Sequence, residues 1–165
     1  MRRSIPLLVA TAALAGSLAA PLVGAPAAAG GTKSAVRIVL DRSVCYGDCP
    51  VYRVEIDGDG AVTYVGRAYV KVIGTRRATV PRSEVDALLA QFHAAKFFDL
   101  KDEYRAPVTD FPTYTVTLEE GGRKKTVVDY AAAAFPKYVT MPAVVTELEK
   151  AIDRVAKTSR WTGVK

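Results

Sequence analysis

The sequence predicts an α+β domain with a mostly antiparallel sheet of about six strands and two helices packed on one face of that sheet. Two observations lead to this prediction. Short stretches in which polar and apolar residues alternate flank glycine-rich turns, as they do in β-hairpins. Two longer stretches repeat apolar residues at helical spacing, and each begins directly after a proline.

The N-terminal part of the chain has the composition of a secretory signal peptide. Arg2 and Arg3 precede an apolar stretch over residues 5–23, and small residues then match the A-x-A pattern of signal peptidase sites. Glycines and prolines interrupt the apolar stretch, which favours cleavage over the alternative of a retained membrane anchor. We therefore expect a signal peptide at 1–29, a flexible leader at 30–35, a single domain at 36–161 and a C-terminal tail at 162–165.

Export places the protein in the periplasm or outside the cell, with no stable membrane span after cleavage. Loss of Arg2 and Arg3 from the 23 basic residues leaves 21 against 17 acidic ones, a net charge of +4. This mild excess is typical of charge that keeps a protein soluble. An exported chain without base-stacking motifs is also not expected to bind nucleic acid.

Four strands are expected in the first half of the domain, at residues 36–41, 52–57, 61–65 and 69–73, with a bend at Gly74 before a continuation over 75–80. The turn Asp57-Gly58-Asp59-Gly60 predicts a hairpin, because glycine adopts the positive φ that tight turns need.

A helix is expected after Pro81, with Val85, Leu88, Leu89 and Phe92 on its apolar face. A second hairpin follows around Gly121 and Gly122. Its expected inward residues are Tyr114, Val116 and Leu118, then Thr126, Val128 and Tyr130. The last helix should begin after Pro142, with an apolar stripe at Val145, Leu148, Ile152 and Val155. Trp161 should fold back onto the core.

Cys45 and Cys49 lie in the turn between the first two expected strands, with Gly47 between them. Two nearby cysteines in an oxidising compartment should form a disulfide. Their spacing differs from the C-x-x-C of thiol oxidoreductases, although a thiol-redox role stays open as an alternative. A zinc site would need four ligands, and beside the two cysteines the sequence offers His93 as the one further soft ligand. We therefore expect no metal and no cofactor.

The motif C-x-G-x-C-P-x-Y at the cysteine turn, followed by a strand and a G-D-G hairpin, resembles a bacterial exported family catalogued as domain of unknown function 6438. The stretches F-F-D-L-K-D-E-Y and P-V-T-D-F-P-T-Y-T-V-T-L are similar to the same family. The resemblance extends from about Val36 to Trp161. It implies no activity, ligand or catalytic residue.

The loop from Lys101 to Pro112 is the best candidate for carboxylate chemistry, with a possible functional set of Asp102, Glu103, Tyr104 and Asp110. Neighbouring carboxylates can raise a pKa or hold calcium, but the regular D-x-D-x-D-G spacing is missing. Structural roles in turns are the alternative for these residues. His93 lacks the neighbouring motifs of a catalytic base, so no catalytic residue is predicted.

Two groups of basic residues could bind an anionic envelope polymer if they met in space. They are Arg76, Arg77 and Arg82, and Arg123, Lys124 and Lys125. Charged residues at hairpin tips also keep sheet edges from aggregating, which is the alternative role.

These observations favour an exported, non-enzymatic domain that binds an envelope component or a protein partner. The alternative is a small periplasmic enzyme, a hydrolase or a thiol-redox protein, that uses the acidic loop or the Cys45/Cys49 turn. The two differ in expected geometry. An enzyme should show a cleft holding polar side chains from distant segments, and a protein-binding module should show a flat patch.

Overall fold

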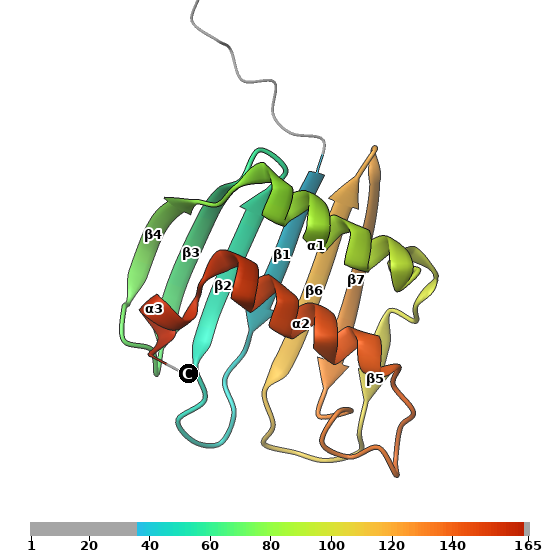
Figure 1. Ribbon diagram of the computed structural model, residues 1–165. Helices are drawn as coiled ribbons and strands as arrows, with labels where there is room; N and C mark the ends of the chain where they lie inside the picture. Colours follow the sequence, from blue (N-terminus) through green and yellow to red (C-terminus); the bar gives the residue numbers. More distant parts are fainter. Residues whose placement is uncertain (1–35, 164–165) are drawn as a thin grey trace, which may run out of the picture. The chain divides into compact units, whose positions relative to one another are not determined.

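The computed structural model describes residues 36–163. The expected signal peptide at 1–29, the leader at 30–35 and the last two residues lie outside the described residues. Within residues 36–163, seven strands form one sheet in the order β4-β3-β2-β1-β6-β7-β5 (Figure 1). Every neighbouring pair is antiparallel except β5 and β7, which are parallel. The predicted α+β class and mostly antiparallel sheet are therefore confirmed, with one strand more than expected.

The strands are β1 (Val36–Arg42), β2 (Val51–Asp57), β3 (Ala61–Ala68), β4 (Gly74–Thr79), β5 (Glu103–Arg105), β6 (Thr113–Glu120) and β7 (Arg123–Tyr130). The helices are α1 (Arg82–Ala94), α2 (Ala143–Ala156) and α3 (Ser159–Thr162), with one turn of 3-10 helix at Phe97–Asp99. The two long helices begin directly after Pro81 and Pro142, as predicted.

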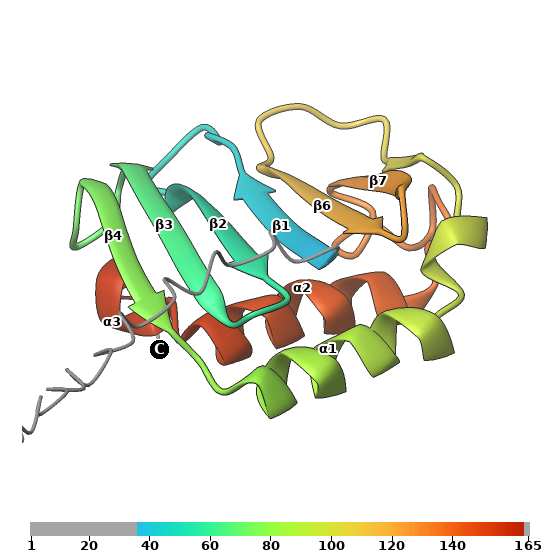
Figure 2. The ribbon, with the colours of Figure 1, turned by 90° about the horizontal axis from the view of Figure 1, so that it is seen from above.

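Helices α1 and α2 lie side by side on the same face of the sheet (Figure 2). The hydrophobic core fills the space between the two layers, where Ile38 and Leu40 of β1 are fully buried. Helix α1 contributes Val85, Leu88 and Phe92 to this core. Leu89, which we expected in the core, is only half-buried and packs at its edge. The predicted two-layer arrangement is thus confirmed.

The opposite face of the sheet carries charged side chains from the central strands. The guanidinium of Arg53 lies 3.3 Å from Glu55 and 3.6 Å from Asp41, and Arg67 pairs with the same Asp41 at 2.9 Å. Antiparallel sheets commonly pack one face on the core and leave the other to solvent, and this sheet follows that pattern.

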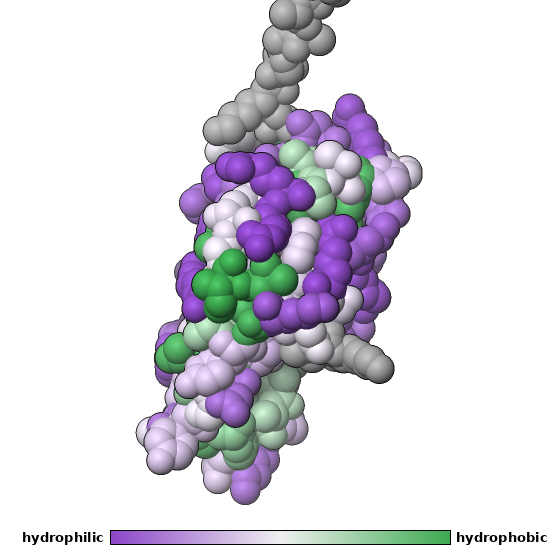
Figure 3. Space-filling model, turned by 90° about the vertical axis from the view of Figure 1, so that its left-hand side faces the viewer, coloured by the Kyte–Doolittle hydropathy of each residue, from purple (hydrophilic) through white to green (hydrophobic). Residues whose placement is uncertain are grey.

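The segment over residues 69–73 is not a strand, contrary to prediction. Tyr69 has a φ of 52°, which breaks the extended chain, and the N–H groups of Lys71 and Val72 donate to carbonyls of α3 instead of to a strand. Strand β4 begins only at Gly74. This end of the sheet has a mixed surface, with an apolar patch among hydrophilic residues (Figure 3).

The C-terminal segment packs on the core through Trp161, as predicted. Its ring stacks on Tyr64 with 4.9 Å between centroids. The ordered chain continues past the expected boundary at 161, because Thr162 is buried in α3 and its carbonyl accepts the hydrogen bond from Lys71.

The return strand of the second hairpin faces the opposite way from the predicted one. Val127 and Asp129 point toward the helices, whereas we expected Thr126, Val128 and Tyr130 there. The loop is the two residues Gly121 and Gly122, both at positive φ, so Glu120 pairs with Arg123. That register places Val127 opposite Val116 and Asp129 opposite Tyr114.

The polar loop at 101–112 contains a strand that the sequence analysis missed. Strand β5 pairs with β7 and places Tyr104 in the core, where it is 4% exposed. Three residues are too few to show an alternating pattern in the sequence. The strand is recognised only through its pairing with β7.

Candidate functional site

Cys45 and Cys49 form a disulfide in the loop between β1 and β2, with 5.8 Å between their Cα atoms. The backbone N–H of Tyr46 donates to the carbonyl of Asp110 at 3.0 Å, which ties this loop to the segment before β6. The side chain of Tyr46 itself is 88% exposed. The disulfide therefore closes a small loop at the edge of the domain.

The structure does not bring the acidic-loop residues into one site. Asp102 pairs with Lys125, Glu103 pairs with Arg105, and Tyr104 is buried in the core. Asp110 is exposed, has a φ of 72° and accepts a hydrogen bond from the hydroxyl of Thr109. The ion pairs of Asp102 and Glu103 were not predicted, whereas Asp110, at a positive φ, lies in a turn as the alternative for this loop expected.

The other candidates are also dispersed. His93 lies 2.8 Å from Glu120 on the exposed side of α1. The first basic group lies on β4 and at the start of α1, and the second lies at the β6–β7 turn, with β3, β2 and β1 between β4 and β6 in the sheet. Within residues 36–163, no three His, Cys, Asp or Glu side chains come together as a metal site requires. No helix in that range is long and apolar enough to cross a membrane.

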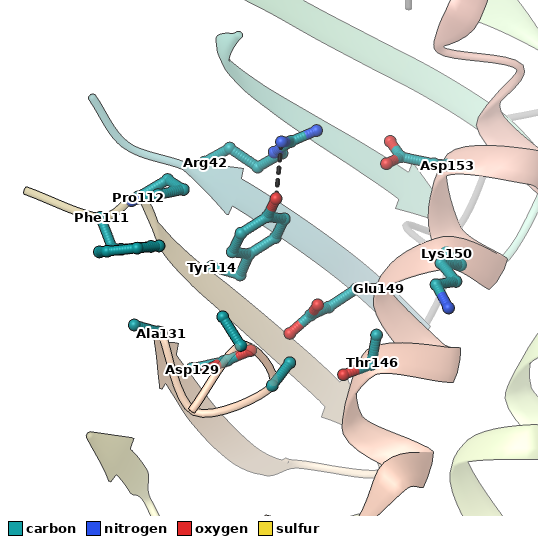
Figure 4. A pocket seen from close by; sticks show the side chains of 12 residues that line it. Arg42, Phe111, Pro112, Tyr114, Asp129, Ala131, Thr146, Glu149, Lys150 and Asp153 are labelled. Atoms are coloured by element: carbon teal, nitrogen blue, oxygen red, sulfur yellow. Dashed lines mark hydrogen bonds between the residues drawn. The ribbon is translucent and has the colours of Figure 1, made fainter. Parts of the chain in front are cut away.

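A polar row runs across one end of the sheet on the face covered by α2. Arg42 at the end of β1 stands opposite Tyr52 of β2 and Tyr114 of β6, and Tyr114 stands opposite Asp129 of β7. Helix α2 contributes the carboxyl groups of Glu149 and Asp153, which point toward this row (Figure 4). This site was not predicted from the sequence.

Hydrogen bonds link the sheet to α2 through Arg42. Its guanidinium donates to the hydroxyl of Tyr114 at 2.7 Å and to that of Tyr52 at 3.3 Å. Tyr52 in turn donates to the carboxylate of Asp153, and the hydroxyl of Thr158 donates to the same group at 2.7 Å. Burial raises the pKa of Asp153, although these hydrogen bonds act in the opposite direction.

Glu149 lies in the same cluster, but within residues 36–163 one of its carboxyl oxygens lacks a hydrogen-bond partner. It is 5% exposed, and among the described residues its Oε1 atom has no hydrogen-bond partner. Burial, followed by the nearby charge of Asp129, raises the pKa of Glu149 to about 8. Asp129 is 3% exposed and accepts a hydrogen bond from the N–H of Ala132 at 2.8 Å. Burial raises its pKa as well.

A cavity of about 300 Å³ opens beside this cluster. The side chains around it combine charged groups with apolar walls, and they are Arg42, Phe111, Pro112, Tyr114, Asp129, Ala131, Ala133, Ala134, Thr146, Glu149, Lys150 and Asp153. A second hollow lies on the other side of Arg42 and Asp153, against Tyr52 and Thr158. The first cavity has the size and the apolar walls of a small-molecule site.

One signal in the sequence could have pointed to this site. Glu149 follows Val145 by four residues and precedes Ile152 by three, so it lies on the buried stripe of α2. A carboxyl group on an apolar stripe is unusual and calls for a partner. Its neighbours Arg42 and Asp129 come from distant strands, and only the fold brings them together.

The fold and this cavity define a small α+β protein with a ligand-sized pocket, part charged and part apolar, between a sheet and its helix layer. The chain belongs to the family described as Domain of unknown function (DUF6438), whose family model matches residues 36–156. The resemblance carried by the cysteine motif and the two hairpins thus led to the right family. No curated protein matches the sequence.

Proposed function

We propose that the protein is an exported domain that binds a small molecule in the pocket between α2 and the sheet. The observation that carries this proposal is Glu149. A buried carboxyl oxygen without a hydrogen bond costs free energy, and a bound molecule that satisfies it would recover that cost. The adjoining cavity of about 300 Å³ offers space for such a molecule.

Export rests on the signal-like N-terminal sequence, and the disulfide is compatible with it because such bonds persist in oxidising compartments. The ligand of an exported domain would come from the cell envelope or the medium. We expected either an envelope component or a protein partner. The polar residues lie in a cavity and come from β1, β6, β7 and α2, which favours a small molecule over a flat protein contact.

A hydrolase is the second candidate, because a carboxyl group whose pKa is raised to about 8 can act as a general acid. Such an enzyme would also need a general base. Asp153 already accepts hydrogen bonds from Tyr52 and Thr158, and Asp129 accepts one from Ala132. Because both carboxylates are engaged in structural hydrogen bonds, binding without turnover is the function that the geometry supports best.

A fragment screen by NMR tests the proposal. The backbone amides of Ala131, Ala133 and Thr146, which line the cavity, should shift with at least one fragment in a panel of small polar compounds. The same fragment should bind more weakly to the Glu149→Gln variant. Glu147→Gln is the matched control, because Glu147 is exposed on the same helix.

Two results would count against small-molecule binding in this pocket. One is a panel in which no compound shifts the cavity amides. The other is a set of shifts confined to residues outside the cavity. Formation of a hydrolysis product from any bound compound would favour the enzyme instead.

A further inference from the structure

The pocket holds more negative than positive charge. Arg42 is an inward-facing cation, whereas Lys150 lies at the rim, where its Nζ is 3.3 Å from Glu147 and points away from the cavity (Figure 4). Three carboxyl groups line the same cavity, and they are Asp129, Glu149 and Asp153. Even with one of them protonated, the interior carries a net negative charge.

The guanidinium of Arg42 already interacts with side chains of the protein. Its two terminal nitrogens donate to the hydroxyl groups of Tyr52 and Tyr114, and its guanidinium stacks over the Tyr114 ring at 4.5 Å from the centroid. The charge of Asp153 lies close enough to act on it. Within residues 36–163, Oε1 of Glu149 is buried without a hydrogen-bond partner, so the carboxyl group of Glu149 is the one in this cluster that is left for a ligand.

We propose that the ligand of this pocket is an organic cation whose protonated nitrogen donates a hydrogen bond to the carboxyl group of Glu149. The apolar part of the ligand would lie against Phe111, Pro112 and the alanines at 131, 133 and 134, which form the walls. This inference rests on the proposed function, because it specifies the ligand class for the same pocket. An ammonium group supplies both the donor and the positive charge that the interior lacks.

An inorganic cation fits this pocket less well than an organic one. A hard metal ion takes six or more oxygen ligands, and no such group of side chains exists among residues 36–163. The guanidinium of Arg42 repels a divalent ion about twice as strongly as a singly charged ammonium group at the same distance. The apolar walls would leave such an ion without ligands on one side, whereas they match the carbon skeleton of an amine.

The protonation state of Glu149 gives this proposal a distinct signature. The groups that act on it are Arg42 from β1, Tyr114 from β6, Asp129 from β7, and Lys150 and Asp153 from its own helix. Because the pKa of Glu149 is about 8 without ligand, the group is mostly protonated near neutral pH. A bound ammonium favours the ionised form, so binding should release close to one proton per ligand at about pH 6.5.

Three probes of matched shape and different charge test the inference with the purified protein. They are benzylamine, benzyl alcohol and benzoate. We expect benzylamine to shift the cavity amides and to bind at least about tenfold more tightly than the other two, because a charge-assisted hydrogen bond forms only with the amine. Glu149→Gln should abolish this preference, and Glu147→Gln should retain it.

Calorimetry in two buffers of different ionisation enthalpy measures the released proton. We expect about one proton per benzylamine for the wild type and none for Glu149→Gln, since glutamine does not titrate. Calcium chloride and sodium chloride at matched ionic strength are the controls, and we expect neither to reproduce the amide shifts.

Several outcomes would overturn the cation inference. Equal binding of all three probes would do so, as would calcium shifts at the same amides or an equal loss of binding in both variants. Tighter binding of benzoate would point instead to Arg42, whose Nε is also buried without a partner in the described part of the chain. In these cases a fragment that binds the cavity still supports the proposed function. That function fails only if the whole fragment panel leaves the cavity unchanged.

Discussion

The phenolic oxygen of Tyr52 on β2 lies 2.7 and 2.8 Å from the two carboxylate oxygens of Asp153 on α2. Tyr52 is 1% exposed, so this contact links the two layers of the domain inside the protein. Tyr52 also accepts a hydrogen bond from Arg42. The position of Arg42 in the pocket therefore depends on the attachment of α2 to the sheet.

Removal of the Tyr52 hydroxyl should destabilise the domain. Tyr52→Phe leaves the partly buried carboxylate of Asp153 with one donor fewer, and we expect a loss of about 1–3 kcal/mol in the free energy of unfolding. Denaturant unfolding would measure this loss. Tyr46→Phe is the control, because Tyr46 is 88% exposed and its hydroxyl should contribute less than about 0.5 kcal/mol. Similar midpoints for the two variants would show that the contact contributes little.

The stability of the wild type should fall as pH rises from about 4.5 to 8. The pKa of Glu149 is about 8 in the folded protein against an ordinary value of 4.5, so the folded state binds more protons than the unfolded state in this window. Stability that depends on a raised pKa is present at low pH and is lost as the group ionises. The pKa values of Asp129 and Asp153 are also raised and act in the same direction.

Glu149→Gln should remove much of that slope. We expect the variant and the wild type to differ little in stability at about pH 4, and the variant to become the more stable of the two by several kcal/mol at about pH 9. Unfolding midpoints across this range provide the measurement, with Glu147→Gln as the control. Parallel curves for wild type and Glu149→Gln would mean that Glu149 ionises normally.

The apolar face of α1 should tolerate truncation unequally. Leu88 is fully buried, and Leu88→Ala should cost about 2–5 kcal/mol through the cavity that it leaves. Leu89 is half-buried at the edge of the core and should cost less. Gln91→Ala on the exposed side should stay within about 0.5 kcal/mol. Equal, small shifts at all three positions in denaturant unfolding would mean that α1 does not pack as described.

The Cys45–Cys49 disulfide should contribute modestly to stability. The bond closes a loop of five residues, for which the chain-entropy relation gives about 2 kcal/mol. We expect a loss of that size for the Cys45→Ser/Cys49→Ser double variant, and an unreduced protein about 2 Da lighter than the dithiol by mass spectrometry. Two thiols that alkylate without reduction would show that the bond does not form in the native protein.

Much of the architecture could be predicted from local patterns. Pro81 and Pro142 indicated where the two long helices begin. The alternation of apolar and polar residues in Val36–Asp41 and residues 52–57 predicted the central strands. The prediction of which β7 residues face the helices was wrong, because two sequence features gave opposite answers. Val128 and Tyr130 suggested one face, but the two-residue turn at Gly121 and Gly122 determines the register and requires the other.

The pocket was harder to predict because it depends on contacts between distant segments. Arg42 and Asp129 look like ordinary polar residues of their strands, and they become neighbours only because β6 lies between β1 and β7. Strand β5 is a similar case, since β7 is the strand with which its three residues pair. Glu149 was the pocket residue whose position in the sequence was unusual, because it is a carboxyl group on the apolar stripe of α2. It is also the residue on which the proposed function depends.

The most direct test of that role is the titration of the Glu149 side-chain carboxyl followed by carbon-13 NMR. The resonance can be assigned by its disappearance in Glu149→Gln. A buried carboxyl without a hydrogen-bond partner should titrate with a midpoint at about 8 in the protein without ligand. A midpoint near the ordinary value of 4.5 would contradict the proposed role of Glu149. The carboxyl group would then be solvated or paired, and it would gain no hydrogen bond from a ligand that it lacks in the free protein.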